Sequence, residues 1–176
     1  MNDDLEERLG YVAARAAIRN TPARQTLEET QAVCAEVKPG EMGPGVKADA
    51  GKPDLVLFPF RALRGPSELA HQNLAEMLQE ERFGEAWVHL TNNELCSIED
   101  VTEILEFGAA KYSPNNWQGV RPGIRYGSGA LRHLLAIESG ENYDPDSKKH
   151  HFAHIGCNVI FCLWMQGQDI NLWATE

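Results

Sequence analysis

Hydrophobic residues recur at helical spacing in three stretches between residues 97 and 166, and the rest of the chain can be organised around them. The first stretch opens with Ser97, whose hydroxyl can accept a hydrogen bond from the backbone three residues on, while Asp100 reaches back. We therefore predict a helix from Ser97 to about Gly108. Its core face comprises Ile98, Val101, Leu105 and Ala109.

The opposite face of this predicted helix is acidic. At about 100° per residue, Glu99, Glu103 and Glu106 fall in one arc. Asp100 lies on the flank of that arc. Like charges on adjacent turns cost about 0.2–0.5 kcal/mol per pair on an isolated helix, so something must offset the repulsion. Water does so on most acidic faces, whereas Mg²⁺ or Mn²⁺ would do so at a metal site, and the pattern leaves both interpretations open.

The third stretch, residues 149 to 166, is apolar almost all round, which is typical of a helix buried in the middle of a domain. Its polar exceptions, His151, His154 and Asn158, follow one stripe at i, i+3 and i+7. Because buried polar groups need partners, this stripe predicts a polar cavity beside the helix.

The second core helix is predicted to begin in Gly127-Ser128-Gly129 and to end at Gly140. One turn in, Arg132 precedes His133 and can make a two-pronged contact with phosphate, or a buried ion pair with a helix carboxylate. The loop that follows offers both metal ligands and phosphate contacts, namely Glu141, Asp144, Asp146, Lys148 and Lys149.

The loop between the first two core helices, residues 112 to 127, contains aromatic side chains that argue against disorder. Trp117 is predicted either to stack on a purine or to pin the loop to the core. An amide in the loop, such as that of Asn116, would read a base edge. Lys111, beside the acidic helix, is predicted to hold phosphate or to pair with Glu106.

The first half of the chain divides near residue 50. Residues 3–19 and 21–37 are predicted to form amphipathic helices, and the Gly- and Pro-rich residues 38–52 a linker. We therefore expect an N-terminal helical extension over residues 1–50 and an all-α domain over residues 51–176.

Between this boundary and the first core helix, Ser67 is predicted to cap a helix that runs to about Phe83 and ends at Gly84. Trp87 and Val88 fit either a short strand or a packed turn, and the sequence does not decide between them.

Composition narrows the functional classes. The chain has 176 residues and a net charge of −10, which argues against a surface that coats nucleic-acid polymers. Its four cysteines show no Cys-x-x-Cys spacing, which favours free thiols in a reducing compartment. The acidic start does not resemble a secretory signal, and no run approaches the ~20 apolar residues that span a bilayer. We expect a cytoplasmic protein without a membrane partner.

Several motifs together resemble the phage dATP/dGTP diphosphohydrolases, the MazZ-like branch of the all-α, MazG-like nucleotide pyrophosphohydrolases. The resemblance covers roughly residues 52 to 165, and about 30 residues before the acidic helix have no counterpart in the family pattern. Its motifs are Lys52-Pro53-Asp54, Leu57-Phe58-Pro59, Phe107 to Tyr112, Asn116-Trp117, Arg132-His133-Leu134, Gly140-Glu141 with Asp144, His151, His154 and Asn158.

This resemblance implies an all-α helical bundle that binds two or more Mg²⁺ or Mn²⁺ ions and cleaves a nucleoside triphosphate between its α and β phosphates. The family motif Glu-Glu-x-x-Glu matches Glu99-Asp100-x-x-Glu103. The motif Glu-x-x-Asp matches either Glu141-x-x-Asp144 or, at the equivalent helical position, His151-x-x-His154. The family also implies a homo-oligomer, a dimer or a tetramer, in keeping with three core helices that leave little room for a closed core.

We therefore expect hydrolysis of dGTP, and of dATP, to the monophosphate and pyrophosphate, in a phage that supplies dGMP for 2-aminoadenine DNA. The expected metal ligands are Glu99, Asp100, Glu103, Glu141, Asp144 and His154, and the expected catalytic carboxylates are Glu103 and Glu106. The expected substrate-binding residues are Lys111, Asn116, Trp117, Arg132, His133, Lys148, His151 and Asn158.

Two other functions fit part of the pattern. One is a zinc hydrolase on His150 and His154, whose i,i+4 spacing suits two imidazoles on one ion, although the glutamate of His-Glu-x-x-His is missing. The other is a non-enzymatic helical assembly module whose acidic helix docks on a basic partner.

Overall fold

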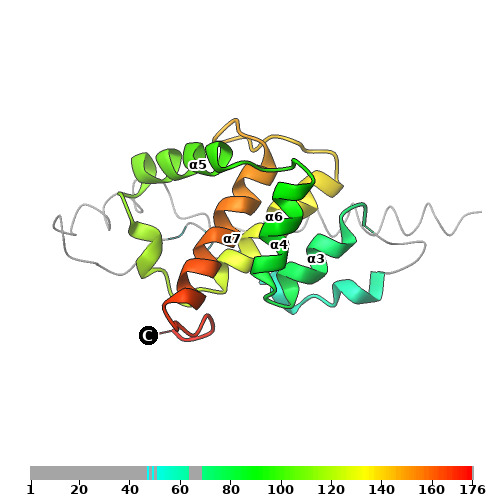
Figure 1. Cartoon of the computed structure of the whole chain (residues 1–176), viewed down its shortest axis with the longest axis horizontal. Helices are drawn as coiled ribbons and strands as arrows, with labels where there is room; N and C mark the ends of the chain where they lie inside the picture. The colour runs from blue at the N-terminus through cyan, green and yellow to red at the C-terminus, as the bar shows by residue number, and fades with distance from the viewer. Residues whose placement is uncertain (1–46, 48, 50, 64–68, 176) are drawn as a thin grey trace, which may run out of the picture.

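The computed structural model describes residues 47, 49, 51–63 and 69–175, and these residues form helices without a strand (Figure 1). The expected all-α fold is confirmed. The predicted N-terminal helices lie outside the described residues, as does most of the predicted linker. The elements are η1 (Leu55–Leu57), η2 (Phe60–Leu63), α3 (Gln72–Gln79), α4 (Phe83–Asn92), α5 (Ile98–Lys111), η3 (Asn116–Gly119), α6 (Arg125–Glu138) and α7 (His151–Gly167).

Helix α7 is the centre of the fold, and α4, α5 and α6 all pack against it. Every residue from His151 to Val159 is buried, which confirms the prediction of a central buried helix. The helix begins after His150, whose Nδ1 accepts a hydrogen bond from the backbone N–H of Phe152 at 3.1 Å. No helix among the described residues is long and apolar enough to cross a membrane.

The start of α5 is fixed by the predicted capping box. Oγ of Ser97 accepts from the backbone N–H of Asp100 at 3.1 Å, and the Asp100 carboxylate accepts from the N–H of Ser97 at 2.8 Å. Val101 is buried as expected, but Ile98 is 70% exposed, so the prediction that Ile98 belongs to the core is wrong. Helix α5 meets α7 where Val101 faces Gly156, and Ile98 lies one turn outside that crossing.

The prediction of one helix from Ser67 to Phe83 is wrong in its described part. The chain turns between α3 and α4 at Glu81, which adopts a left-handed φ of 57°, and Gly84 lies inside α4 instead of ending a helix. Trp87 and Val88 are helical, so neither the strand nor the turn is correct. A glutamate in the left-handed region is uncommon, so nothing in the sequence indicated a turn at Glu81.

The pair α3 and α4 is part of the core and not an appended insertion. Leu74 and Leu78 of α3 and Phe83 and Leu90 of α4 are almost completely buried, with α3 against α6 and α4 against α7. Helix α6 begins two residues before the predicted glycine segment, and its C-cap is followed by Gly140 at a φ of 86°, close to the predicted stop.

Gly156 sets how closely α7 approaches α5 and the chain before it. A Cβ added there would lie 2.5 Å from Sγ of Cys96 and 3.2 Å from Cγ2 of Val101. Gly156→Ala should therefore lower the free energy of unfolding, because overpacking of about 1–3 kcal/mol exceeds the gain of up to about 1 kcal/mol in helix propensity. Chemical denaturation measures the change.

Two further variants make this prediction specific. Cys96→Ala should recover part of the loss in a double-mutant cycle, because it removes the sulfur that the new methyl group meets. Gly84→Ala is the matched control, since a Cβ there meets nothing within 4 Å and should not destabilise the protein. Equal losses at Gly84 and Gly156 would contradict the account.

Candidate active site

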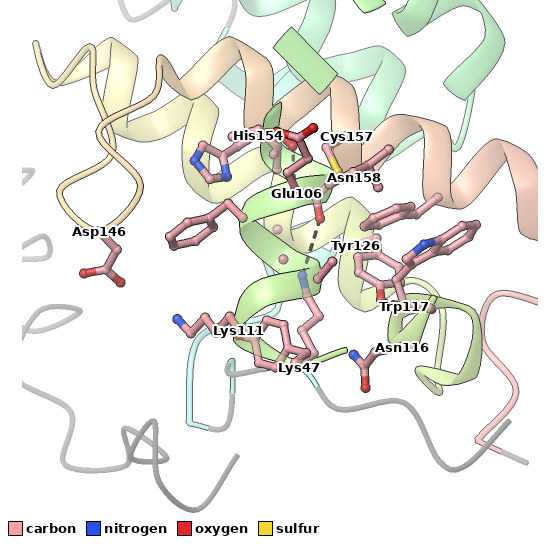
Figure 2. A pocket seen from close by; sticks show the side chains of 18 of the residues that line it. Lys47, Glu106, Lys111, Asn116, Trp117, Tyr126, Asp146, His154, Cys157 and Asn158 are labelled. Carbon is pink, nitrogen blue, oxygen red and sulfur yellow. Dashed lines mark hydrogen bonds between the residues drawn. The ribbon is translucent and has the colours of Figure 1, made fainter. Parts of the chain in front are cut away.

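A cavity of about 1200 Å³ opens between α5, α6, α7 and the loop that contains η3. Lys47, Asp49 and Lys52, which we call the strap, complete its boundary. Figure 2 shows side chains from all of these parts converging on one space. The volume is large enough for a nucleotide-sized ligand.

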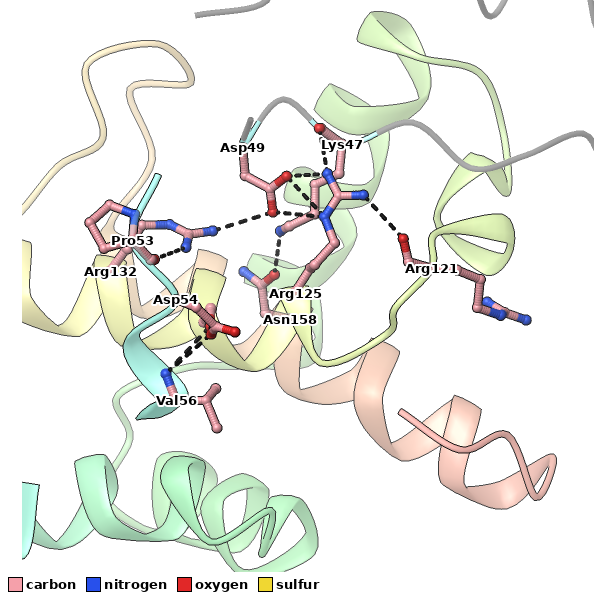
Figure 3. A network of polar contacts seen from close by, with 10 residues as sticks. Lys47, Asp49, Pro53, Asp54, Val56, Arg121, Arg125, Arg132 and Asn158 are labelled. Carbon is pink, nitrogen blue, oxygen red and sulfur yellow. Dashed lines mark hydrogen bonds and ion pairs between the residues drawn. The ribbon is translucent and has the colours of Figure 1, made fainter. Parts of the chain in front are cut away.

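The strap is held on α6 by a buried carboxylate. Asp49, whose side chain is 8% exposed, accepts from Nε of Arg125 at 3.0 Å and lies 3.6 Å from NH2 of Arg132. The Arg125 guanidinium also donates to the carbonyl of Lys47 at 2.9 Å, and that of Arg132 to the carbonyl of Pro53 at 3.1 Å (Figure 3). These bonds cross about 76 residues of sequence, so long-range pairing fixes the strap.

Lys47 extends from the strap into the cavity. Its ammonium lies 3.4 Å from Oδ1 of Asn158 and 4.5 Å from the centre of the Tyr126 ring. Gly129 leaves room for this approach, because a Cβ there would lie 2.9 Å from Nζ of Lys47. Burial, assisted by the charges of Arg132 and its neighbours, lowers the pKa of Lys47 to about 7.

Arg132 also lines the cavity, so the wall formed by α6 and the strap carries excess positive charge. Its ion pair is with Asp49 of the strap and not with a carboxylate of α5, the partner that the sequence suggested. Burial lowers the pKa of Arg132, but a guanidinium remains protonated in proteins. At the far end of α5, Lys111 adds a further cation to the lining.

A group of imidazoles and carboxylates lies at the other side of the cavity. Nδ1 of His133 is 2.9 Å from Nδ1 of His151, and Nε2 of His151 is 3.2 Å from Oε1 of Glu141. Nε2 of His154 lies 2.7 Å from Oγ of Ser147. Burial lowers the pKa of His133 well below its usual value, and the neighbouring histidines act in the same direction, so this imidazole is neutral at pH 7.

Asp144 joins this group from the loop before α7. Its Oδ1 accepts from the backbone N–H of Ser147 at 2.8 Å and lies 3.8 Å from Nε2 of His154. Burial acts to raise the pKa of Asp144, but the Ser147 hydrogen bond and His154 outweigh it, and the net pKa is lowered. The carboxylate is therefore ionised at neutral pH.

Aromatic rings form the remaining wall. The Trp117 ring stacks on Phe161 with centroids 4.4 Å apart and meets Trp164 edge-on at 4.9 Å. Its backbone carbonyl accepts from the hydroxyl of Tyr126 at 3.0 Å. Trp117 thus pins its loop to the core, as one of the two interpretations predicted, and it also lines the cavity.

The acidic face of α5 is only partly directed at the cavity. All three glutamates of this face are exposed, but Glu106 lines the cavity, whereas Glu99 and Glu103 do not. The Glu103 carboxylate instead pairs with Lys149 at 2.7 Å, and that of Asp100 is occupied in the capping box. The predicted carboxylate cluster therefore divides into one residue inside the cavity and three outside its lining.

Of the fifteen residues that the sequence assigned to the site, nine line the cavity together and six do not. The first set is Glu106, Lys111, Asn116, Trp117, Arg132, His133, Asp144, His154 and Asn158. Two residues outside the lining are linked to it: His151 contacts His133, and Glu141 contacts His151. Glu99, Asp100, Glu103 and Lys148 are also outside it.

The two histidines of the zinc interpretation have different surroundings. His150 caps α7, and its ring stacks on Phe152 with centroids 5.2 Å apart. His154 bonds to Ser147 and stacks on the His133 ring at 4.4 Å. The group of possible metal ligands that the described residues form includes neither of the pair.

Comparison with known proteins decides the family. Residues 79–173, more than half of the chain, match the family model for the N-terminal region of dATP/dGTP diphosphohydrolases. The chain belongs to the dATP/dGTP diphosphohydrolase family. This confirms the resemblance found in the sequence.

A curated relative agrees with this assignment. A protein of Salmonella phage PMBT28 named dATP/dGTP diphosphohydrolase is 33% identical over 67 residues. The match spans 38% of this chain and 23% of that protein's length. No solved structure matches the chain.

The family match begins after the strap. The sequence pattern did not predict the strap either. Lys47 and Asp49 precede residue 79, in a Gly- and Pro-rich stretch that composition assigned to a linker. Tyr126 and Phe161 were missed because they carry no charge and fit helical core positions. The sequence feature that could have indicated the strap is the set of charged residues Lys47, Asp49 and Lys52 among small residues.

The lowered pKa of Lys47 should make the stability of this family member depend on pH. The side chain faces Arg132, Asp49, Arg125 and Lys52, with His133 and His154 farther off. Between the folded pKa of about 7 and the ordinary lysine value of 10.5, the unfolded chain binds a proton there that the folded chain does not, so stability should rise with pH.

Lys47→Met should therefore raise the melting temperature most at and below pH 7, and the gain should shrink towards pH 10. Circular dichroism melts across this range measure it. Lys148→Met, which changes an exposed lysine outside the cavity lining, is the control and should leave the melting temperature nearly constant. A gain at Lys47 that does not vary with pH would contradict the pKa argument.

Proposed function

We propose that this protein is a metal-dependent hydrolase that cleaves a purine deoxynucleoside triphosphate between its α and β phosphates. The observation that carries the proposal is the division of one nucleotide-sized cavity into a cationic wall, an aromatic wall and a group of metal-ligand side chains. The family assignment supports the nucleotide, and the name of the Salmonella phage relative supports dGTP and dATP.

The cationic wall suits a triphosphate. Lys47, Lys111 and Arg132 all line the cavity, and the overall charge of the chain is −10, so the positive charge is local. Arg132 offers a planar fork to phosphate oxygens, and Lys47 a compact point charge. A bound polyanion would stabilise the protonated form of Lys47 and thus recruit its charge.

The donors along the cavity fit a divalent cation. Asp144 supplies carboxylate oxygens, and His133 and His154 supply imidazole nitrogens. A bound divalent ion would neutralise phosphate charge and lower the pKa of its water. We propose two or more Mg²⁺ or Mn²⁺ ions, with Glu141 supporting the group through its contact with His151.

Within this scheme, Glu106 is the general base. It is the α5 carboxylate that lines the cavity, where it can accept the proton of the attacking water. The aromatic wall of Trp117 and Tyr126 would flank the purine ring of the substrate, and the amide of Asn116 would contact the edge of that ring. Tethering both ends of the nucleotide holds the scissile bond near the metal-ligand group.

The wider setting is also proposed. We propose a cytoplasmic homo-oligomer in a phage-infected cell that supplies dGMP for 2-aminoadenine DNA. Light scattering tests the assembly, because the mass of a single 19.6 kDa chain at micromolar concentration would contradict it.

Product analysis tests the reaction. With Mn²⁺ or Mg²⁺, dGTP and dATP should give the monophosphate and pyrophosphate in equal amounts, resolved by anion-exchange chromatography. Nucleoside diphosphate with orthophosphate would contradict cleavage between the α and β phosphates.

A pair of isosteric variants tests the role of α5. Glu106→Gln should lower kcat by about 10²- to 10⁴-fold, because the amide cannot accept the proton. Glu103→Gln is matched in chemistry and lies one turn away, outside the cavity lining and paired with Lys149, so it should lower kcat much less. A larger loss at Glu103 than at Glu106 would instead place catalysis on the part of α5 outside the cavity.

A further inference from the structure

Three possible metal ligands meet where α6, α7 and the loop between them come together. The ligand atoms of His133, Asp144 and His151 all lie within 4.8 Å of one another. His133 and Asp144 line the cavity, whereas His151 is buried, with 2% of the residue exposed, and does not line it. The residues come from three different elements, so tertiary structure and not a local motif assembles them.

The bonds of His151 decide which of its nitrogens offers a lone pair. Its Nε2 lies 3.2 Å from the Glu141 carboxylate. An ionised carboxylate accepts hydrogen bonds and cannot donate them. A neutral His151 therefore carries its proton on Nε2, and its Nδ1 lone pair faces Nδ1 of His133 at 2.9 Å. A carboxylate behind a histidine is the usual outer shell of a metal-bound imidazole.

The third ligand is fixed by its own hydrogen bonds. Oδ1 of Asp144 accepts from the backbone N–H groups of Asp146 at 3.1 Å and Ser147 at 2.8 Å. The carboxylate is thus oriented before any ligand arrives. Preorganised donors of this kind lose little conformational freedom when they bind an ion.

We propose that His133, His151 and Asp144 bind a divalent transition metal, of the class of Mn²⁺, Co²⁺ or Zn²⁺, in preference to Mg²⁺. Imidazole suits transition metals, whereas Mg²⁺ prefers oxygen ligands and keeps much of its water. Two imidazoles and one carboxylate leave coordination positions for other ligands and leave the site a net positive charge.

Glu141 is a positioning residue in this scheme, because it holds the tautomer of His151. The inference rests on the proposed function only for what fills the remaining coordination positions, a phosphate oxygen or water. It moves the metal away from the α5 motif that the resemblance indicated, since Glu99 and Glu103 do not line the cavity.

The competing explanation needs no metal. Nδ1–H of His133 could donate to Nδ1 of His151 and form a purely structural hydrogen bond. That bond would be preserved in a protein that has no preference among cations. Metal binding measured without nucleotide therefore separates the two explanations.

The experiment uses the full chain, stripped with a chelator, dialysed and then equilibrated with Co²⁺ alone. Elemental analysis should find about one Co²⁺ per chain, visible d–d absorption should appear, and excess Mg²⁺ should not displace the ion. His133→Ala and His151→Ala should abolish both signals. Wild-type protein that binds no Co²⁺, or releases it to Mg²⁺, overturns the proposal.

Two further variants guard against misfolding. Glu141→Gln keeps the buried histidines and should weaken Co²⁺ binding by about 10- to 100-fold. His89→Ala changes a histidine of α4 outside the cavity lining and should bind Co²⁺ like the wild type. Undiminished Co²⁺ binding by His133→Ala overturns the proposal.

Failure of this inference is distinguishable from failure of the proposed function. Hydrolysis of dGTP with Mg²⁺ by protein that binds no Co²⁺ overturns the metal site alone. Bound Co²⁺ in protein that hydrolyses no deoxynucleoside triphosphate supports the metal site and overturns the proposed function alone.

Discussion

The buried carboxylate of Asp49 holds the strap against α6 and so completes the wall of the cavity. It balances the guanidinium groups of Arg125 and Arg132, which would otherwise face each other across a partly buried space. Removing one partner of such a buried network costs about 3–5 kcal/mol, because the remaining charges stay desolvated. The strap, and the Lys47 ammonium that it carries, therefore depend on this network.

The buried position of Lys47 lowers the stability of the fold and places a positive charge in the cavity. A lysine whose folded pKa is about 7 is costly to bury, and its approach to Asn158 is possible only because Gly129 has no side chain. The charged ammonium does not stabilise the folded state, but it would stabilise a bound polyanion. Asn158, which is 8% exposed on the central helix, accepts from Lys47 and donates to the carbonyl of His154, and it lines the cavity (Figure 2).

The sequence predicted the features that depend on local spacing. The Ser97 capping box and the polar stripe of α7 follow from three- and seven-residue intervals, and both are present. Long-range features were missed, because nothing local shows that Asp49 pairs with Arg125, 76 residues away. Periodicity likewise showed that α5 has an acidic face, but only the packing of α5 shows that Glu106 borders the cavity and Glu103 does not.

A crystal structure with Mn²⁺ and a dGTP analogue that carries an imido bridge between the α and β phosphates tests the central claim most directly. The account predicts triphosphate density against Lys47 and Arg132, the base along Trp117 and Tyr126, and anomalous manganese signal beside His133 and Asp144. An analogue bound on the exposed face of α5, with the cavity empty, would contradict it.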